Sequence, residues 1–287
     1  MKGIIVYDRL VAEDREWYIG HHIECASRHG MELSLVYTDE VLAGELLPAE
    51  GTSALPEFAI MRDINPEAQK MLEDMGVTVF NSSKVSDICN DKLAAYDHIE
   101  KLFGEKIFLP VFSFDEYDGQ YPMVLKSRSG CGGTQVFWAD SREQAIRIIE
   151  ESGLGSEQFI VQVPCNNPGI DIRTYVIGDR AVVAMKRENA LLGEEDGHDV
   201  SEYFRSNFEL GGRAARYDIE SDTLLYDMVM KIAKDLKPGL IGIDFIFHNG
   251  RPVFNEIEDV VGSRMVYANT DVDIVEEYTS YIHSVMS

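Results

Sequence analysis

The amino-acid sequence predicts an α/β protein built from several closely associated lobes. Segments typical of strands and of helices alternate over the first eighty or so residues. Beyond residue 81 the pattern changes to strands that meet at a glycine-rich turn, and beyond residue 171 it changes again to hairpins. The chain has 287 residues, which is long for one small core and suggests two or three lobes.

The first lobe is predicted to contain a parallel sheet covered by helices. Its expected strands and helices span residues 3–7, 16–29, 33–37, 57–61, 66–75 and 77–80. Asn65 is a suitable N-cap for the second helix, and Gly76 is a suitable stop signal after it. Strands that alternate with helices in this way form parallel sheets with both faces covered.

Two further groups of elements follow, and both are expected to be α+β. The first group comprises a helix at 92–103, strands at 123–126 and 134–138 around the glycine-rich turn, a helix at 142–151 and a strand at 158–162. The second group comprises strands at 173–177 and 181–186, a helix at 222–236 and strands at 240–247 and 252–257. Tight turns at 178–179 and 248–250 predict antiparallel hairpins within the second group.

Composition and charge exclude several classes of protein. The chain contains 26 Lys and Arg residues against 50 Asp and Glu residues, a net charge of −24. A field of this sign repels nucleic acid and anionic membrane surfaces. No run of eighteen apolar residues exists, and the apolar run at 3–7 is too short for a signal peptide. We therefore expect a cytoplasmic protein with no nucleic-acid and no membrane partner.

The four cysteines indicate neither a disulfide framework nor a zinc site. Cys25, Cys89, Cys131 and Cys165 are scattered, with no C-x-x-C pair and no histidine at zinc-binding spacing. Because disulfides are unusual in the cytosol, we expect reduced thiols.

Three carboxylates in the last expected hairpin are the strongest indication of a functional site. Glu256 and Glu258 are two residues apart on one strand and so share a face, and the turn brings Asp244 opposite them. Like charges near 4 Å repel by about 4 kcal/mol per pair at intermediate dielectric, so the trio needs a cation. Any one of these acids alone is more simply an exposed residue of an acidic protein. Together they predict an all-oxygen site for Mg²⁺ or Mn²⁺.

A second element is suited to binding phosphate. Lys126 ends an expected strand, and the small residues of 127–134 follow it, including Gly130, Gly132 and Gly133. Small residues let backbone N–H groups approach phosphate oxygens, and Lys126 adds a positive charge. The alternative is an ordinary mobile turn, because the segment matches neither G-x-G-x-x-G nor a Walker motif.

Polar residues of the first lobe lie where a substrate could bind. Arg62 and Asp63 follow the third expected strand, and ligands of open α/β sheets bind at the carboxyl ends of strands. They are therefore placed to contact a carboxylate substrate. His21 and His22, in the first expected helix, are interpreted as a surface pair.

These motifs, taken in order, resemble those of the ATP-grasp carboxylate–amine ligases, and within them the ribosomal-protein glutamate ligase and related amino-acid ligases. The matching segments, spread over roughly residues 60 to 265, are 81–83, 90–92, 122–126 with its glycine loop, 162, 169–173, 176–179, 204–207, 211–212, 244 and 256–258. Each motif is loose alone, but the ordered set is specific.

The resemblance implies roles for individual residues. Contacts to the nucleotide are implied for Lys92, Lys126, Gly130, Gly132, Gly133, Gln162, Val163, Asp171, Arg205, Ser206 and Asn207. Among them, the two lysines would hold phosphates, Gln162 and Val163 would meet adenine, and Asp171 would meet the ribose. Catalytic positions near the phosphates and the transferred acyl group are implied for Arg173, Arg187, Arg205 and Asn207, and metal ligation for Asp244, Glu256 and Glu258.

Arg264 is a further catalytic candidate, because it follows Glu258 by six residues. Its planar guanidinium could clamp the acyl phosphate or the incoming carboxylate. A structural role at a helix end is the alternative.

Three positions and one segment depart from the family pattern. Glu258 stands where the family often has Asn, Val163 where it often has Glu, and Gln135 where the loop often has its last Gly. The segment 188–203 is about ten residues longer than the corresponding loop, by the same comparison of spacing. This insertion leaves the identity of the substrate open.

The resemblance implies an ATP-grasp fold in three parts: an N-terminal parallel α/β domain (1–85), a small α+β lid (86–163) and a C-terminal α+β catalytic domain (164–287). It implies an enzyme that uses ATP and Mg²⁺ (or Mn²⁺) to activate a carboxylate as an acyl phosphate and join it to an amine. The substrates would be amino acids, peptides or a protein tail, and the relatives often form homo-oligomers. The alternatives are an ATP-grasp phosphotransferase and a non-catalytic nucleotide-sensing protein.

Overall fold

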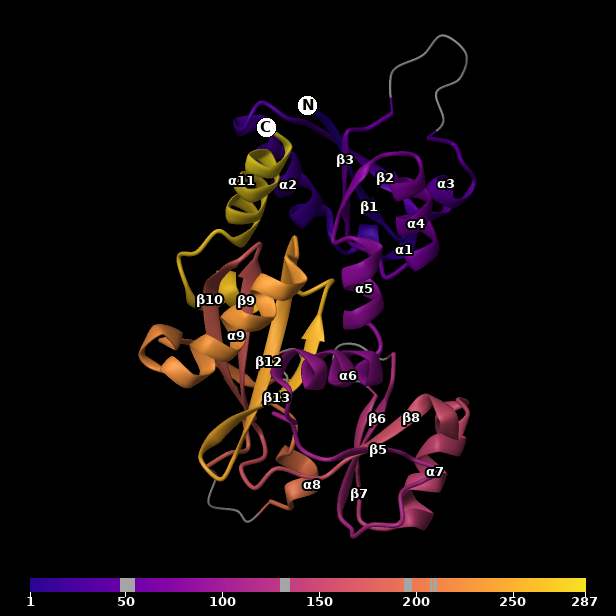
Figure 1. Cartoon of the computed structure of the whole chain (residues 1–287), viewed down its shortest axis with the longest axis vertical. Helices are drawn as coiled ribbons and strands as arrows, with labels where there is room; N and C mark the ends of the chain where they lie inside the picture. Colours follow the sequence, from indigo (N-terminus) through magenta and orange to yellow (C-terminus); the bar gives the residue numbers. More distant parts are fainter. Residues whose placement is uncertain (47–54, 130–134, 194–197, 207, 209–210) are drawn as a thin grey trace.

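A computed structural model describes residues 1–46, 55–129, 135–193, 198–206, 208 and 211–287. The fold contains a parallel sheet at one end, a large antiparallel sheet in the middle and a small antiparallel sheet at the other end (Figure 1). The predicted α/β class is confirmed. In the part of the chain described here, no helix is both long and apolar enough to cross a membrane.

The first lobe contains the expected parallel sheet, and its strand order is β2-β1-β3-β4. Its strands and helices are β1 Lys2–Tyr7, α1 Arg9–Glu13, α2 Glu16–Arg28, β2 Glu32–Tyr37, α3 Thr38–Leu42, β3 Phe58–Met61, α4 Pro66–Asp74 and β4 Thr78–Phe80. The predicted cap is present, because the Asn65 side chain accepts a hydrogen bond of 2.9 Å from the Ala68 amide at the start of α4. The carboxyl ends of β1 and β3 therefore point toward the middle of the molecule.

The large sheet has the antiparallel order β11-β10-β9-β12-β13. It is formed by β9 Ile170–Ile177, β10 Arg180–Glu188, β11 Arg213–Tyr217, β12 Leu240–His248 and β13 Arg251–Glu258, with α8 Val200–Tyr203, a 3-10 turn Ile219–Ser221 and α9 Thr223–Leu236 between them. One face of α9 is buried, and Leu225, Val229 and Ile232 share a core with β9 and β12. Both predicted hairpins are present.

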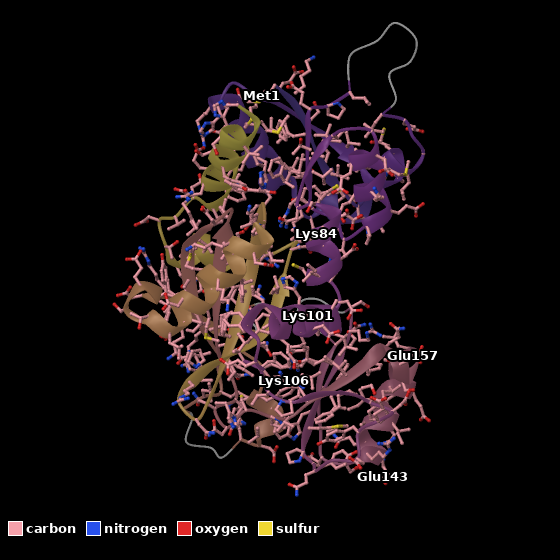
Figure 2. All side chains as sticks on the ribbon, viewed as in Figure 1. Met1, Lys84, Lys101, Lys106, Glu143 and Glu157 are labelled. Carbon is pink, nitrogen blue, oxygen red and sulfur yellow. The ribbon has the colours of Figure 1, made fainter. Side chains whose placement is uncertain are left out.

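The small sheet has the order β5-β8-β6-β7. It is formed by β5 Val111–Ser113, β6 Met123–Ser127, β7 Val136–Ala139 and β8 Phe159–Gln162, with α7 Arg142–Ser152 and a 3-10 turn Ser156–Gln158. In Figure 2, Glu143 and Glu157 mark its outer side, and Lys84 lies on α5 (Ser83–Cys89) near the parallel sheet. The helix α6 (Lys92–Phe103) lies between the small sheet and β13 (Figure 1).

The C-terminal segment returns to the first lobe. The helices α10 Arg264–Asn269 and α11 Ile274–Met286 follow β13, and α11 packs beside α2 (Figure 1). One apolar core contains Ile5 and Phe58 of the parallel sheet together with Tyr175, Val261 and Ile274. The division of the chain into domains after residues 85 and 163 stays a prediction. In space, α11 packs against the first lobe.

Candidate active site

The three predicted carboxylates converge at the hairpin of β12 and β13. Asp244 pairs with Glu256 in the strand register, and one oxygen from each of Asp244, Glu256 and Glu258 lies within 4.8 Å of the others. Asp244 is fully buried, whereas the two glutamates are partly exposed. An all-oxygen set of this spacing is suited to a hard divalent cation such as Mg²⁺. The role of the trio as metal ligands stays a prediction.

A β-bulge sets which side chains reach this point. The register of the hairpin shifts between Asp244 and Phe245, so one extra residue of β13, Asn255, is inserted there. Before the bulge, Phe254 faces the apolar core; after it, Ile257 faces the core and Glu256 faces the opposite side. An extra residue reverses the alternation of a strand. The bulge therefore allows both a core phenylalanine and a cavity glutamate at even-numbered positions.

Two arginines compensate the buried Asp244. Arg173 on β9 donates to both Asp244 oxygens at 2.7 Å and to Glu258 Oε1 at 2.6 Å. Arg187 on β10 donates to Asp244 Oδ2 at 2.6 Å. Burial alone would raise the pKa of Asp244, but the two guanidinium groups outweigh it and lower that pKa to about 2. The predicted catalytic arginines thus lie at the trio, where they hold Asp244 ionised.

Asp171 faces the second arginine as well. Its carboxylate accepts hydrogen bonds from Arg187 at 2.5 and 2.7 Å and from the Ser206 hydroxyl. Burial raises the pKa of Asp171, and Arg187 opposes this rise. Both Asp171 and Ser206 line a cavity beside the trio, but their polar groups are already used within the protein. Their expected contacts to the nucleotide stay predictions.

The two predicted phosphate-binding lysines lie close to the trio. Lys126 lies near the end of β6, and its Nζ atom donates to Asn255 Oδ1 at 2.8 Å. Burial lowers the pKa of Lys126 to about 8. Lys92 begins α6, and its Nζ atom lies 3.9 Å from Glu256 Oε2. Sequence reasoning missed Asn255, whose contact with Lys126 depends on the bulge.

A cavity of about 100 Å³ lies on the side of the small sheet. It is lined by residues of the small sheet, by Pro164 after β8 and by Arg205; the residues of the sheet are Val124, Lys126, Val136, Trp138 and Gln162. Gln162 is buried and its amide donates to the Tyr96 hydroxyl at 3.2 Å. The Val163 amide donates to the Pro110 carbonyl at 3.1 Å, so the expected adenine contact has to use the Val163 carbonyl.

A larger cavity of about 380 Å³ lies on the side of the first lobe. Residues from the carboxyl ends of β1 and β3, from the start of α2 and from the loop after β13 line it. The two cavities share five lining residues, namely Arg173, Arg187, Asn255, Glu256 and Glu258. Two members of the trio, Glu256 and Glu258, therefore line both cavities and can contact a ligand in each, while Asp244 is buried beneath them.

The remaining predicted site residues either line one of the two cavities or lie outside the described residues. Arg264 lines the larger cavity and begins α10, an end at which a positive charge does not stabilise a helix. Arg205 lines the smaller cavity, and its guanidinium lies 5.4 Å from the Phe204 ring centre. The predicted Gly130, Gly132, Gly133 and Asn207 lie outside the described residues.

The interpretation of His21 and His22 as a surface pair is only partly correct. His21 is partly buried, and its Nε2 atom lies 2.8 Å from Asp273 Oδ2. His22 is 3% exposed, so the surface interpretation is wrong for this residue. Arg62 and Asp63 both line the larger cavity, and their expected contact with a carboxylate substrate stays a prediction.

Known proteins resemble this chain in sequence and in fold. The model of the RimK-like ATP-grasp domain matches residues 111–282. A protein of Maridesulfovibrio salexigens named as a probable alpha-L-glutamate ligase is 29% identical over 263 residues, which is 87% of this chain and 80% of that protein.

Two solved structures share the fold over nearly the whole chain. The D-alanine–D-alanine ligase of Bacillus anthracis, complexed with ATP, superposes with a TM-score of 0.70 at 14% identity and covers 100% of this chain and 99% of its own. The ATP-grasp ligase PsnB, complexed with a phosphomimetic variant of a minimal precursor, Mg and ADP, gives a TM-score of 0.69 at 15% identity, with 99% and 98% coverage. The ATP-grasp fold is thereby confirmed.

Proposed function

Because this chain belongs to the RimK-like ATP-grasp family, we propose that it is an ATP-dependent ligase that joins the carboxylate of one substrate to the amine of another. The observation that carries the proposal is the position of the acidic trio between two cavities. One cavity would hold ATP and the other an amino acid or the end of a peptide. The relative named as a probable alpha-L-glutamate ligase supports an amino acid as a substrate.

The residues of the smaller cavity are suited to a nucleotide. Val124, Val136 and Trp138 supply an apolar surface for a base, while Lys126 lies at the end nearest the trio. A phosphate chain that runs past Lys126 would end near Glu256. Mg²⁺, held by Asp244, Glu256 and Glu258, would neutralise charge on the phosphates during transfer.

The residues around the trio would position the reacting groups. A carboxylate is a poor electrophile, and phosphorylation gives it a good leaving group that an amine can displace. Phosphoryl transfer depends mainly on positioning and on charge stabilisation. Arg173 and Arg187 are fixed by ion pairs on neighbouring strands and reach both cavities, so they can orient the acyl group without reorganising.

The proposal is tested with the purified protein, Mg-ATP and mixtures of amino acids. We expect release of ADP and phosphate that requires both a carboxylate and an amine substrate, and a new amide in the product by mass spectrometry. A stable phosphorylated product formed without an amine would indicate a phosphotransferase instead. Binding of ATP without turnover in any mixture would indicate a nucleotide sensor.

Replacing Glu256 by Gln gives a direct test of the trio. This change keeps the side-chain shape but removes one charge, and we expect turnover to fall by about 100-fold or more with an unchanged circular dichroism spectrum. Glu151→Gln, on the exposed surface of α7, is the matched control and should keep wild-type turnover. Full activity of Glu256→Gln would contradict the metal-binding role.

A further inference from the structure

A second group of metal-binding side chains lies where α11 packs beside α2 (Figure 1). It consists of His21 and Cys25 of α2 and of Asp273, the N-cap residue of α11. One ligand atom from each lies within 4.8 Å of the others, and among the described residues only this group and the acidic trio have that arrangement. None of the three side chains lines either of the two cavities described above. The group is therefore separate from the candidate active site.

The two ligands on α2 are placed together by the helix itself. Residues four apart lie one above the other on a helix, so His21 and Cys25 share a face. Cys25 is 0% exposed, and its Sγ atom lies 3.8 Å from His21 Nε2. Nitrogen and sulfur ligands of a tetrahedral zinc ion are about 3.6 Å apart, as bonds of about 2.1 and 2.3 Å require. This pair therefore needs little movement to hold the ion.

The third ligand comes from a distant part of the sequence and is also held in place. Asp273 Oδ2 lies 2.8 Å from His21 Nε2, and Asp273 Oδ1 accepts from the Tyr267 hydroxyl at 2.8 Å. The His21 ring is stacked on Trp17, with ring centres 5.0 Å apart. Neighbours that orient a ligand in this way favour metal binding. Because a carboxylate only accepts hydrogen bonds, His21 Nε2 carries a proton here, and a metal ion would displace that proton.

An arginine already places a positive charge beside the thiol. Arg28 Nη2 lies 3.0 Å from Cys25 Sγ and 2.7 Å from Glu276 Oε2. The Arg28 side chain is 45% exposed, and its Nη1 atom donates to Glu24 at 2.9 Å, so it can turn toward solvent when an ion arrives. The Glu276 carboxylate, which also contacts the Cys25 thiol, would then be free to take a fourth position around the ion.

We propose that His21, Cys25 and Asp273 form a zinc site and that the bound ion fastens α11 to α2. An imidazole nitrogen, a thiolate and a carboxylate oxygen suit Zn²⁺, whereas Mg²⁺ and Ca²⁺ take oxygen ligands. The expectation that no cysteine belongs to a zinc site rested on spacing along the chain, which cannot show that residue 273 lies beside residues 21 and 25. This inference does not depend on the proposed ligase function.

Zinc binding is tested on the full chain after EDTA treatment, with a non-thiol reductant and excess Mg²⁺ to compete at the acidic trio. Calorimetric titration should show one Zn²⁺ bound per chain with a dissociation constant of about 1 μM or below. At free Zn²⁺ 100 times this constant, the folding equilibrium constant measured by urea unfolding should rise about 100-fold. Co²⁺, a spectroscopic probe of zinc sites, should give a thiolate-to-cobalt charge-transfer band in the near ultraviolet.

The cysteine ligand is tested with the cobalt band. Cys25→Ser keeps the size of the side chain but removes the thiolate, so the band should disappear. Cys89→Ser, which replaces another buried thiol, is the matched control and should keep the band. A band of the same intensity in Cys25→Ser and in the wild type would overturn the assignment.

The other two ligands are tested with zinc itself. His21→Gln and Asp273→Asn should each raise the dissociation constant for Zn²⁺ about 100-fold or more, and Asp273→Asn keeps an acceptor to cap α11. His98→Gln is the matched control, because His98 Nε2 also lies 2.8 Å from an aspartate oxygen, Asp235 Oδ2, on another pair of helices. This control should bind Zn²⁺ as the wild type does.

The remaining outcomes distinguish this site from the active site. No increase in stability with Zn²⁺, or an equal increase in His21→Gln and in the wild type, would overturn the inference. Stabilisation by Zn²⁺ that is lost in Glu256→Gln but kept in His21→Gln would place the ion at the acidic trio and would also overturn it. Turnover of ATP by His21→Gln should match the wild type, so a failure of the zinc site and a failure of the ligase proposal are separate results.

Discussion

At the scale of single residues, the active site balances its own charge inside a strongly acidic chain. The groups that meet at the trio are four carboxylates and four cations: Asp171, Asp244, Glu256, Glu258, Lys92, Lys126, Arg173 and Arg187. The net charge of the whole chain therefore gives no information about the charge of this site. Ion pairs in a poorly hydrated interior are strong only when both partners are well oriented, as the two arginines are here.

His22 is a second residue whose environment the sequence did not reveal. It lies on α2 with its ring 6.1 Å from that of Tyr278, centre to centre. Burial lowers the pKa of His22 to about 3, and the nearby charges of Arg62 and His21 lower it further while Asp273 opposes them. The ring is therefore neutral in the folded protein at neutral pH.

This buried histidine should make stability depend on pH. Because the folded pKa lies below the unfolded value, the unfolded chain binds a proton between about pH 6.5 and 3 that the folded chain does not. Stability is complete above pH 6.5 and falls as the pH decreases, by about 2 kcal/mol at pH 5. When the free energy of unfolding is measured with urea at several pH values, His22→Gln should lose this decrease in stability between pH 6.5 and 5. His98→Gln, on α6, should keep it. The same dependence of the free energy of unfolding on pH in His22→Gln and in the wild type would contradict this account.

The site residues were predictable to the extent that they follow strand alternation and motif order. The convergence of Asp244, Glu256 and Glu258 follows from period-two spacing and a tight turn. The contact of Lys126 with Asn255 did not follow, because it depends on the bulge. The contact of Asp171 with Arg187 crosses the predicted hairpin of β9 and β10, whereas the contact with Ser206 was hidden, because the sequence does not show that residue 206 returns to this hairpin.

At the scale of elements, most long helices and most strands were predicted, whereas the shortest helices and α11 were not. The helices α2, α4, α6, α7 and α9 and most strands match the predicted ranges to within a few residues. The five-residue α1 and α3 are too short for an apolar face to be recognised. The helix α11 was missed because its apolar face contains tyrosines, Tyr278 among them, that resemble surface residues in sequence.

The cap of α4 gives a prediction at this scale. Asn65→Ala removes the acceptor for the Ala68 amide and should lower the free energy of unfolding by about 1 kcal/mol. Because α4 does not line either cavity in the described structure, kcat should not change. Chemical unfolding and steady-state assays check the two statements. A loss of stability far beyond this amount, or a change in kcat, would show that Asn65 does more than cap the helix.

At the scale of the whole molecule, the parallel and the large antiparallel sheets are held as one unit. Their apolar residues share a core, to which α11 contributes. Asn81, after β4, adds polar contacts: its side chain accepts from the Gly239 amide at 2.6 Å and donates to the Leu240 carbonyl at 2.8 Å. The 81–83 motif of the family resemblance thus has a structural role in joining the lobes.

The shared core should make these two sheets unfold together. Tyr278→Ala removes a side chain that is 2% exposed and should lower the free energy of unfolding by about 3–5 kcal/mol. In a Trp138→Phe background, fluorescence of Trp17 on α2 and circular dichroism of the whole chain should shift to the same lower urea concentration. Val285→Ala, at a position of α11 that is 50% exposed, should change little. Separate transitions would show that the lobes are independent.

The position of α11 also bears on how the protein is made. A chain leaves the ribosome from its N-terminus, so the parallel sheet emerges well before α11 (Figure 1). Until residues 274–286 have emerged, the surface of α2 that receives them stays uncovered, with Cys25 and Ala26 among the apolar groups exposed to water. The first lobe of this protein is therefore completed only after α11 has been made, and a chain that stops before residue 274 leaves it open to aggregation.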